Sequence, residues 1–198
     1  YAQARQVPTR LSGAETARLI LDSAGLTDVD VEVTPGELTD HYSPSERIIR
    51  LSPEVYRGRS LASVGIAAHE AGHALQHAFG YAPLMITQIA YPAASFGSSL
   101  GILALLIGLG IGLTWLAWVG VYLFAGVVVF QVINLPVEFN ASRRAKQLLV
   151  ERGIVPPDEM PYVNRVLNAA AWTYVAATLQ AILTLLYYLL LVSSRDRE

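Results

Sequence analysis

The feature that most constrains this chain is a run of 67 residues, 71–137, without a single Asp, Glu, Lys or Arg. A second run of this kind covers 166–194. Each run exceeds the roughly 20 residues that a helix needs to cross a bilayer. Core helices of a soluble protein are the alternative, but 67 uncharged residues are hard to shield from water in a chain of 198. We therefore expect a mainly α-helical, multi-pass membrane protein.

Turn signals divide these runs into three predicted transmembrane helices, over residues 86–111, 115–136 and 168–192. The glycine-rich segment 108–112 lets the chain reverse between the first two. Aromatic rings collect near one end of the second span, as they do at the boundary between lipid and water. These rings belong to Trp115, Trp118 and Tyr122.

Residues 1–60 have the composition of a soluble segment. Ser12 and Glu15 form a capping box, which predicts the start of a short helix. Valines alternate with acidic residues over 29–33, the period of a half-buried strand, and 47–51 has the pattern of a second strand. We expect the two to pair as a small two-stranded β element.

The composition excludes several classes of protein. Lys and Arg number 14 against 16 Asp and Glu, so no basic excess is present to neutralise a nucleic acid. Charged residues make up 15% of the chain and apolar residues 53%, which excludes a disordered chain. The chain has no cysteine, so a disulfide framework, a thiolate metal site and a thiol nucleophile are excluded. Any metal site must use histidine and carboxylate ligands.

An HExxH motif carries the chemistry. It lies in a predicted helix over 61–79, where His69 and His73 share one face and can reach one ion. Glu70, between them, can contact a water on that ion without binding the ion itself. Zinc lowers the pKa of such a water to about 7, so Glu70 can take its proton. This spacing is typical of metalloproteases.

A hydrolytic zinc site needs a third protein ligand, and Glu138 is the predicted one. It is the first charge after the run 71–137 and follows Pro136 at the end of the second span. A carboxylate at that position is costly unless it is paired or binds a cation. The alternative is a salt bridge with Arg143 or Arg144.

Two other histidines are weaker candidates for the third ligand. His77 lies on the same helix face, but i and i+8 are about 12 Å apart along a straight helix. We therefore expect His77 beside the metal ligands, or simply as a polar residue at the membrane surface. His41 and Tyr42 lie in a predicted loop, where they could line the cleft and contact substrate.

Further polar side chains have possible roles near the site. Tyr174, near the start of the third span, could donate a hydrogen bond to a developing oxyanion, although a tyrosine is also expected at the level of the lipid headgroups. Arg143 and Arg144 could orient Glu138 or bind lipid phosphate.

These motifs together resemble the YugP-type membrane zinc metallopeptidases. The resemblance implies a multi-pass membrane protein with peptidase activity. Members usually begin with a further membrane helix, and this chain begins at Tyr1, so we expect that something has been removed from its start. The matching segments run in order over nearly the whole chain and are Ser12-Gly13, Leu38–Tyr42, Ile49–Ser52, Ala68–Gln76, Leu135–Ala145, Leu167–Ala171 and Thr173–Ala176.

More distantly the chain resembles the HtpX-type and prenyl-protein-processing membrane proteases. In these, HExxH supplies two zinc ligands and the Glu of a downstream ExxxD pattern supplies the third, which Glu138 matches. Ser142 stands at the Asp position, which leaves open what orients the neighbouring ligand. In these relatives an edge strand before the HExxH helix aligns an extended peptide, and Arg47–Ser52 would take that place. The alternative is a strand paired only within the fold.

The residues and the resemblance predict an integral membrane zinc endopeptidase with a zincin-like HExxH helix and a gluzincin-like ligand arrangement. His69, His73 and Glu138 would hold one Zn²⁺ per chain, with Glu70 as general base. The partners would be a peptide or protein substrate and the lipid bilayer, and no nucleic acid. The alternatives are a metal transporter, which would place ligands at mid-span, and a catalytically silent membrane scaffold that retains the zinc fold.

Twelve of the 14 basic residues flank the HExxH side of the spans, which predicts an active site at the cytosolic face. In a bacterial cell the membrane would be the plasma or inner membrane. The expected parts are an N-terminal zincin-like part (1–83), a transmembrane hairpin (84–136), a Glu-ligand helix with a linker (137–165), the third span (166–192) and a tail (193–198).

Overall fold

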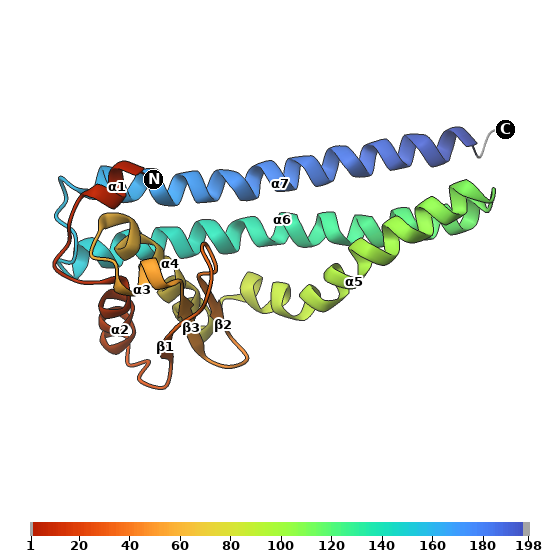
Figure 1. Ribbon diagram of the computed structural model, residues 1–198. Coiled ribbons are helices and arrows are strands. Elements are labelled where there is room, and N and C mark those ends of the chain that lie inside the picture. Colours follow the sequence, from red (N-terminus) through yellow and green to blue (C-terminus); the bar gives the residue numbers. More distant parts are fainter. Residues whose placement is uncertain (1, 196–198) are drawn as a thin grey trace. The chain divides into compact units, whose positions relative to one another are not determined.

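The computed structural model describes residues 2–195, which are mainly helical with one small sheet (Figure 1). The described elements, in chain order, are α1 (Ala2–Gln6), α2 (Gly13–Ser23), β1 (Asp30–Val33), β2 (His41–Ser43), β3 (Ile48–Leu51), α3 (Pro53–Arg57), α4 (Leu61–Ala78), α5 (Ala82–Gly110), α6 (Thr114–Glu151) and α7 (Met160–Arg195).

The chain forms two compact units. The first contains the residues up to Tyr81 together with Val137–Trp172, and the second contains Ala82–Pro136 and the described residues from Thr173 onward. The first unit holds the sheet, α4 and the HExxH motif. The second holds the most apolar parts of α5, α6 and α7.

α2 begins at the predicted capping box, and α4 covers nearly all of the predicted range 61–79, whereas the short helices α1 and α3 were not predicted. The Ser12 backbone N–H donates to Glu15 Oε2 (2.7 Å) and the Glu15 N–H donates to Ser12 Oγ (3.2 Å), so the predicted capping box is confirmed. Ser60 Oγ accepts from the Ser63 N–H at the start of α4. Gly80 follows the end of this helix with φ of 64°, a left-handed conformation that suits glycine.

The sheet has three strands in the order β1-β3-β2, so the expected two-stranded element is corrected to three. β1 runs parallel to β3, and β2 runs antiparallel to it. The segment His41–Ser43, predicted as loop, is strand β2. It was missed because three residues are too few to display the alternation that marks a strand.

The expectation that Arg47–Ser52 forms an edge strand is wrong, because β3 is paired on both sides. The sequence pattern reveals the strand but not its neighbours, and the third strand occupies the edge that β3 would otherwise expose. β2 is therefore an edge strand of the described sheet.

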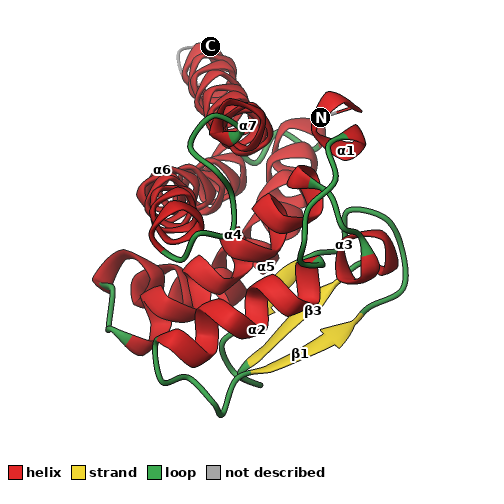
Figure 2. Cartoon of the chain, turned by 90° about the vertical axis from the view of Figure 1, so that its left-hand side faces the viewer, coloured by secondary structure: helices red, strands yellow, loops and turns green. Residues whose placement is uncertain are grey.

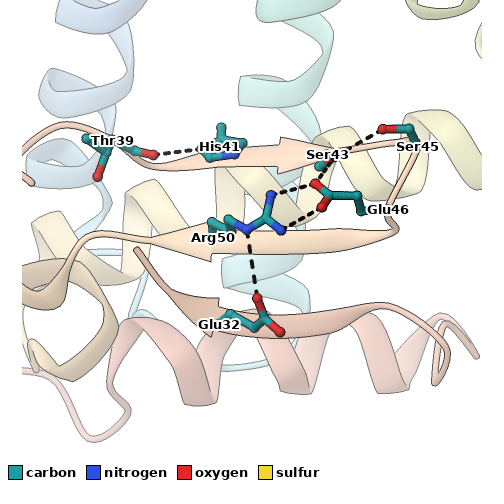
Figure 3. Close-up of polar contacts among 7 residues, drawn as sticks. All are labelled: Glu32, Thr39, His41, Ser43, Ser45, Glu46 and Arg50. Atoms are coloured by element: carbon teal, nitrogen blue, oxygen red, sulfur yellow. Dashed lines mark hydrogen bonds and ion pairs between the residues drawn. The ribbon is translucent and has the colours of Figure 1, made fainter. Parts of the chain in front are cut away.

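A series of polar contacts around Arg50 connects the three strands (Figure 3). Arg50 of β3 donates to both carboxylate oxygens of Glu46, at 2.6 and 2.9 Å, and lies 3.8 Å from the carboxylate of Glu32 on β1. Glu46 also accepts from the Ser43 hydroxyl. The hydrogen bonds from Arg50 and Ser43 lower the pKa of Glu46 to about 2.

The core of the first unit lies between α4, α2 and the sheet, with α6 and α7 residues completing it (Figure 2). Most side chains of α4 are small and apolar, which lets the neighbouring elements approach the helix closely. The fully buried side chains include Ile20, Leu21, Ile49, Leu51, Leu61, Val64, Leu149 and Val163.

The second unit has the close helix contacts expected in lipid. A Cβ added at Gly120 of α6 would lie 2.5 Å from the Gly101 carbonyl oxygen of α5, so only glycine fits there. α5, α6 and α7 are each long and apolar enough to span a membrane, with only 11–22% of their most apolar segments buried within the protein. Three candidate membrane-spanning helices, as predicted, are confirmed.

The second of these helices differs from expectation at its end. We expected the span to stop at 136 and a separate Glu-ligand helix to follow within 137–165, but α6 is one helix through Pro136 to Glu151. Proline removes one backbone hydrogen bond without necessarily ending a helix. α6 thus contributes residues to both units.

Candidate metal centre

Three donor side chains from α4 and α6 come together in the first unit. His69 and His73 lie one turn apart on α4, with ring centroids 4.7 Å apart. Glu138 Oε2, on α6, lies 3.2 Å from His69 Nε2 and 3.6 Å from His73 Nε2. One donor atom from each residue falls within 4.8 Å of the others. Two imidazoles and a carboxylate are a donor set that suits Zn²⁺.

A glycine inside the motif allows this approach. Gly72 faces α6, and a Cβ added there would lie 2.7 Å from the Ala141 carbonyl oxygen. Any side chain at 72 would push the two helices apart. The HExxH helix can therefore bring its imidazoles to Glu138 because the residue before His73 has no side chain.

The outer nitrogen of each imidazole has a partner. Ser142 Oγ lies 3.1 Å from His69 Nδ1, and Gln76 Oε1 lies 2.9 Å from His73 Nδ1. When Nδ1–H donates to such an oxygen, the lone pair remains on Nε2, the atom that faces Glu138. Ser142, which stands at the aspartate position of the ExxxD pattern, is thus the residue that contacts His69 Nδ1.

The electrostatics of the cluster favour a cation. Burial lowers the pKa of His73, but the hydrogen bond to Glu138, the negative charges of Glu70 and Glu138 and the hydrogen bond to Gln76 outweigh burial and raise it to about 9. Glu138 is 8% exposed and is paired with the imidazoles. The cluster therefore attracts positive charge into a site with little access to water.

Glu70 lies beside the cluster without joining it. Its side chain is 8% exposed, and its negative charge acts on His73. Within residues 2–195, its carboxylate forms no ion pair or hydrogen bond. Such a carboxylate is available to accept a proton from a water held near the donors.

Comparison with known proteins decides the family. The family described as "putative neutral zinc metallopeptidase" matches residues 1–193. The chain belongs to this family. It is 48% identical over 188 residues to the "putative membrane protease YugP" of Bacillus subtilis (strain 168), an alignment that covers 94% of this chain and 84% of the relative. No solved structure matches the chain.

Membership of the zinc metallopeptidase family supports a zinc-dependent protease and implies zinc as the metal. The donor chemistry of this chain fits that ion, because two Nε2 atoms and a carboxylate oxygen converge while both Nδ1 atoms are bonded elsewhere.

The other two histidines of this family member lie outside the donor cluster. His77 Nδ1 is 2.9 Å from the Tyr42 hydroxyl of β2, so His77 connects the HExxH helix to the edge strand. His41 is exposed, with Nδ1 2.8 Å from the Thr39 carbonyl oxygen (Figure 3). Neither histidine belongs to the three-residue donor group.

The remaining candidates have separate surroundings. Arg144 Nε donates to Asn140 Oδ1 at 2.9 Å, while Arg143 lines an open surface depression that includes Lys146 and Pro157. Tyr174 belongs to the second unit, and its proposed role as oxyanion donor stays a prediction.

Gln76 is the residue that sequence reasoning missed. It lies three positions after His73 and is completely buried. The sequence does contain one indication of its role: a glutamine on the apolar side of a helix rich in small residues, one turn beyond a metal-binding motif.

Proposed function

We propose that this chain is an integral membrane zinc endopeptidase of gluzincin-like arrangement, with one Zn²⁺ held by His69, His73 and Glu138. The observation that carries the proposal is the convergence of these three donors next to a buried carboxylate that has no other partner among the described residues. The family supports it, since its members are described as zinc metallopeptidases.

Glu70 performs the proton transfers. Zinc, when bound, polarises the peptide carbonyl and makes water a better nucleophile at neutral pH. Glu70 accepts a proton from the attacking water and then returns it to the leaving amine, so the same side chain serves as general base and general acid. Its burial keeps this proton away from bulk solvent.

The substrate would bind as an extended strand along β2. The Asp30 N–H donates to the Arg47 carbonyl and the Thr34 N–H donates to the Leu51 carbonyl. The backbone N–H and C=O groups of every second residue from Arg47 to Leu51 therefore point toward β1. The residues between them, Ile48 and Arg50, then face β2. Tyr42 lies opposite Ile49, and its backbone N–H and carbonyl therefore point to the outer edge.

An extended peptide could pair with that outer edge by β-augmentation. The edge lies next to the site, because the Tyr42 ring packs against His77, one turn beyond His73 on α4. In this proposal β2, rather than Arg47–Ser52, is the strand with which the substrate pairs.

The three apolar helices would place the enzyme in a bilayer as a multi-pass protein, with the site at the cytosolic face. The charge distribution supports this side, because 12 of the 14 basic residues belong to segments that flank the site. A peptidase so placed would act on peptide or protein segments near the membrane.

The test uses the purified full chain in detergent, with metal analysis and cleavage of an unfolded casein-like substrate measured on the same sample. Glu70→Gln should retain one zinc per chain and lose cleavage, because glutamine cannot accept the proton. Cleavage by the unaltered chain should stop with a chelator and return with zinc. Unchanged turnover by Glu70→Gln would remove Glu70 from the mechanism.

Two other outcomes would favour the alternatives. Metal flux into liposomes without any proteolysis would indicate a transporter. Stoichiometric zinc with neither flux nor proteolysis, on membrane-associated and unfolded substrates alike, would indicate a catalytically silent scaffold.

A further inference from the structure

Gln76 is a primary amide with no access to solvent. Its exposed fraction is 0%, in a helix whose buried positions are otherwise dominated by small and apolar residues. Burying an amide costs free energy unless each polar atom finds a partner. All its polar atoms find one: Oε1 lies 2.9 Å from His73 Nδ1, and Nε2 donates to the Val137 carbonyl (2.8 Å) and to Asn140 Oδ1 (3.0 Å).

These partners fix which way round the amide lies. The Val137 carbonyl can only accept, so the NH₂ group of Gln76 must face it. Oε1 then faces His73, and an amide oxygen can only accept, so His73 Nδ1 must carry the proton. When the ring is neutral, as a metal ligand must be, the lone pair of His73 is then on Nε2, the nitrogen directed at Glu138. An acceptor-only group on α6 thus dictates the tautomer of a histidine on α4.

The same amide also holds α6. Val137 precedes Glu138 and Asn140 follows it by two positions, so the two donors of Gln76 hold residues on both sides of the third candidate ligand. Arg144 Nε donates to the same Asn140 oxygen, which fixes the orientation of that side chain. One buried side chain therefore contacts one metal ligand and both flanks of another.

We propose that Gln76 is a positioning residue for the metal centre: it holds His73 in the Nδ1–H tautomer and keeps α4 in register with the Glu138 segment of α6. This rests on the proposed function, since it takes His73 and Glu138 as ligands. Its contribution is to metal affinity and geometry, and it touches neither the substrate nor the reacting atoms.

The experiment measures metal binding by the full-length protein in detergent. Zinc affinity is obtained by competition with a chromophoric chelator, and geometry from the absorption spectrum of the Co²⁺-substituted protein. Gln76→Met, of similar length but without polar atoms, should lower zinc affinity by roughly 10–100-fold and alter the Co²⁺ spectrum. Gln76→Glu, which keeps an acceptor opposite His73 Nδ1, should recover part of the loss.

The matched control is Leu61→Ala, in the first turn of the same helix. Leu61 is fully buried, so its truncation destabilises the fold. Because it touches no ligand, its folded fraction should bind zinc with unaltered affinity. If Gln76→Met behaves like this control, with unaltered affinity and an unaltered Co²⁺ spectrum, Gln76 is only a packing residue and the inference is overturned.

A measurement on the unaltered protein keeps the inference testable if Gln76→Met does not fold. Nitrogen-15 NMR of the zinc-loaded chain should show His73 with its proton on Nδ1 and the metal on Nε2. Coordination through Nδ1 would overturn the inference and leave the zinc peptidase proposal intact. No zinc binding at His73 in the unaltered chain would overturn both.

Discussion

His69 Nε2 lies 3.2 Å from Glu138 Oε2, although the two residues are 69 positions apart in the sequence. The intervening chain contains all of α5 and most of α6. Removing this carboxylate should weaken zinc binding more than it destabilises α4 and α6. Glu138→Ala should lower zinc affinity by more than the roughly 10–100-fold typical of a supporting residue, as measured by chelator competition. Glu151→Ala, at the exposed end of the same helix, is the control, and full zinc occupancy of Glu138→Ala would give the third position to another residue.

Gly72→Ala should separate the two helices that carry the donors. The added Cβ would meet the Ala141 carbonyl oxygen at 2.7 Å, a backbone atom that cannot rotate away. We expect a loss of about 1–3 kcal/mol in the free energy of unfolding together with weaker zinc binding, measured by thermal unfolding and chelator competition.

Gly65→Ala is the control for this variant on the same helix. The Cβ there would meet only a methyl group of Val163, at 3.2 Å, and a side chain can shift. Equal zinc affinity in the two variants would contradict the role given to Gly72.

The pKa of Glu46 should depend on Arg50. The carboxyl has a pKa of about 2 in the fold against an ordinary value of 4.5, so the ion pair stabilises the sheet fully above about pH 4.5 and its contribution disappears as the pH falls toward 2. Arg50→Gln should bring the pKa of Glu46 back toward its ordinary value, as observed by NMR titration of the side-chain carboxyl. A pKa that stays near 2 would assign the shift to Ser43 instead.

The outer edge of β2 should affect substrate binding rather than metal binding. Tyr42→Pro removes the backbone donor and the ring, whereas Tyr42→Ala removes the ring alone. If the substrate pairs with this edge, Tyr42→Pro should raise KM several-fold above that of Tyr42→Ala while zinc affinity is the same in both. Identical KM values would exclude pairing at this position.

Membrane orientation can be measured with single cysteines, because the chain has none of its own. Asp158, exposed in the first unit, and Leu113, between α5 and α6, are suitable positions. An impermeant thiol reagent added to intact cells should label Leu113→Cys and leave Asp158→Cys unlabelled until the cells are opened. The reverse pattern would put the site on the outer face.

The helices and the donor residues were the predictable part. A long run without charges has few stable structures other than a long apolar helix. Ser60 and Gly80 mark the two ends of α4 through local backbone contacts, which do not depend on distant segments. His69 and His73 are brought together by helix geometry alone. Glu138 could be predicted because a carboxylate directly after an apolar run is conspicuous, and the structure brings it to them. Its role as a ligand stays a prediction.

What could not be predicted depends on contacts between distant segments. β2 has three residues and is a strand because β3 offers it an edge. Pro136 looked like the end of a helix, but α6 continues past it. Gln76 follows the HExxH motif by one turn, but its contacts depend on α6, and the sequence does not show that its amide lies between His73 and the Val137 carbonyl.

Ser142 and Gln76, which contact the outer nitrogens of the two imidazoles, are both uncharged. Among the described residues, Glu138 belongs to the donor group and Glu70 acts on it from beside, so these two carboxylates would balance the charge of a bound dication. An electrically neutral assembly loses little solvation energy when it is taken out of water. An additional carboxylate would leave a net negative charge, whose desolvation costs free energy. A serine at the acid position of the ExxxD pattern would therefore keep a metal-loaded centre compatible with surroundings of low dielectric constant.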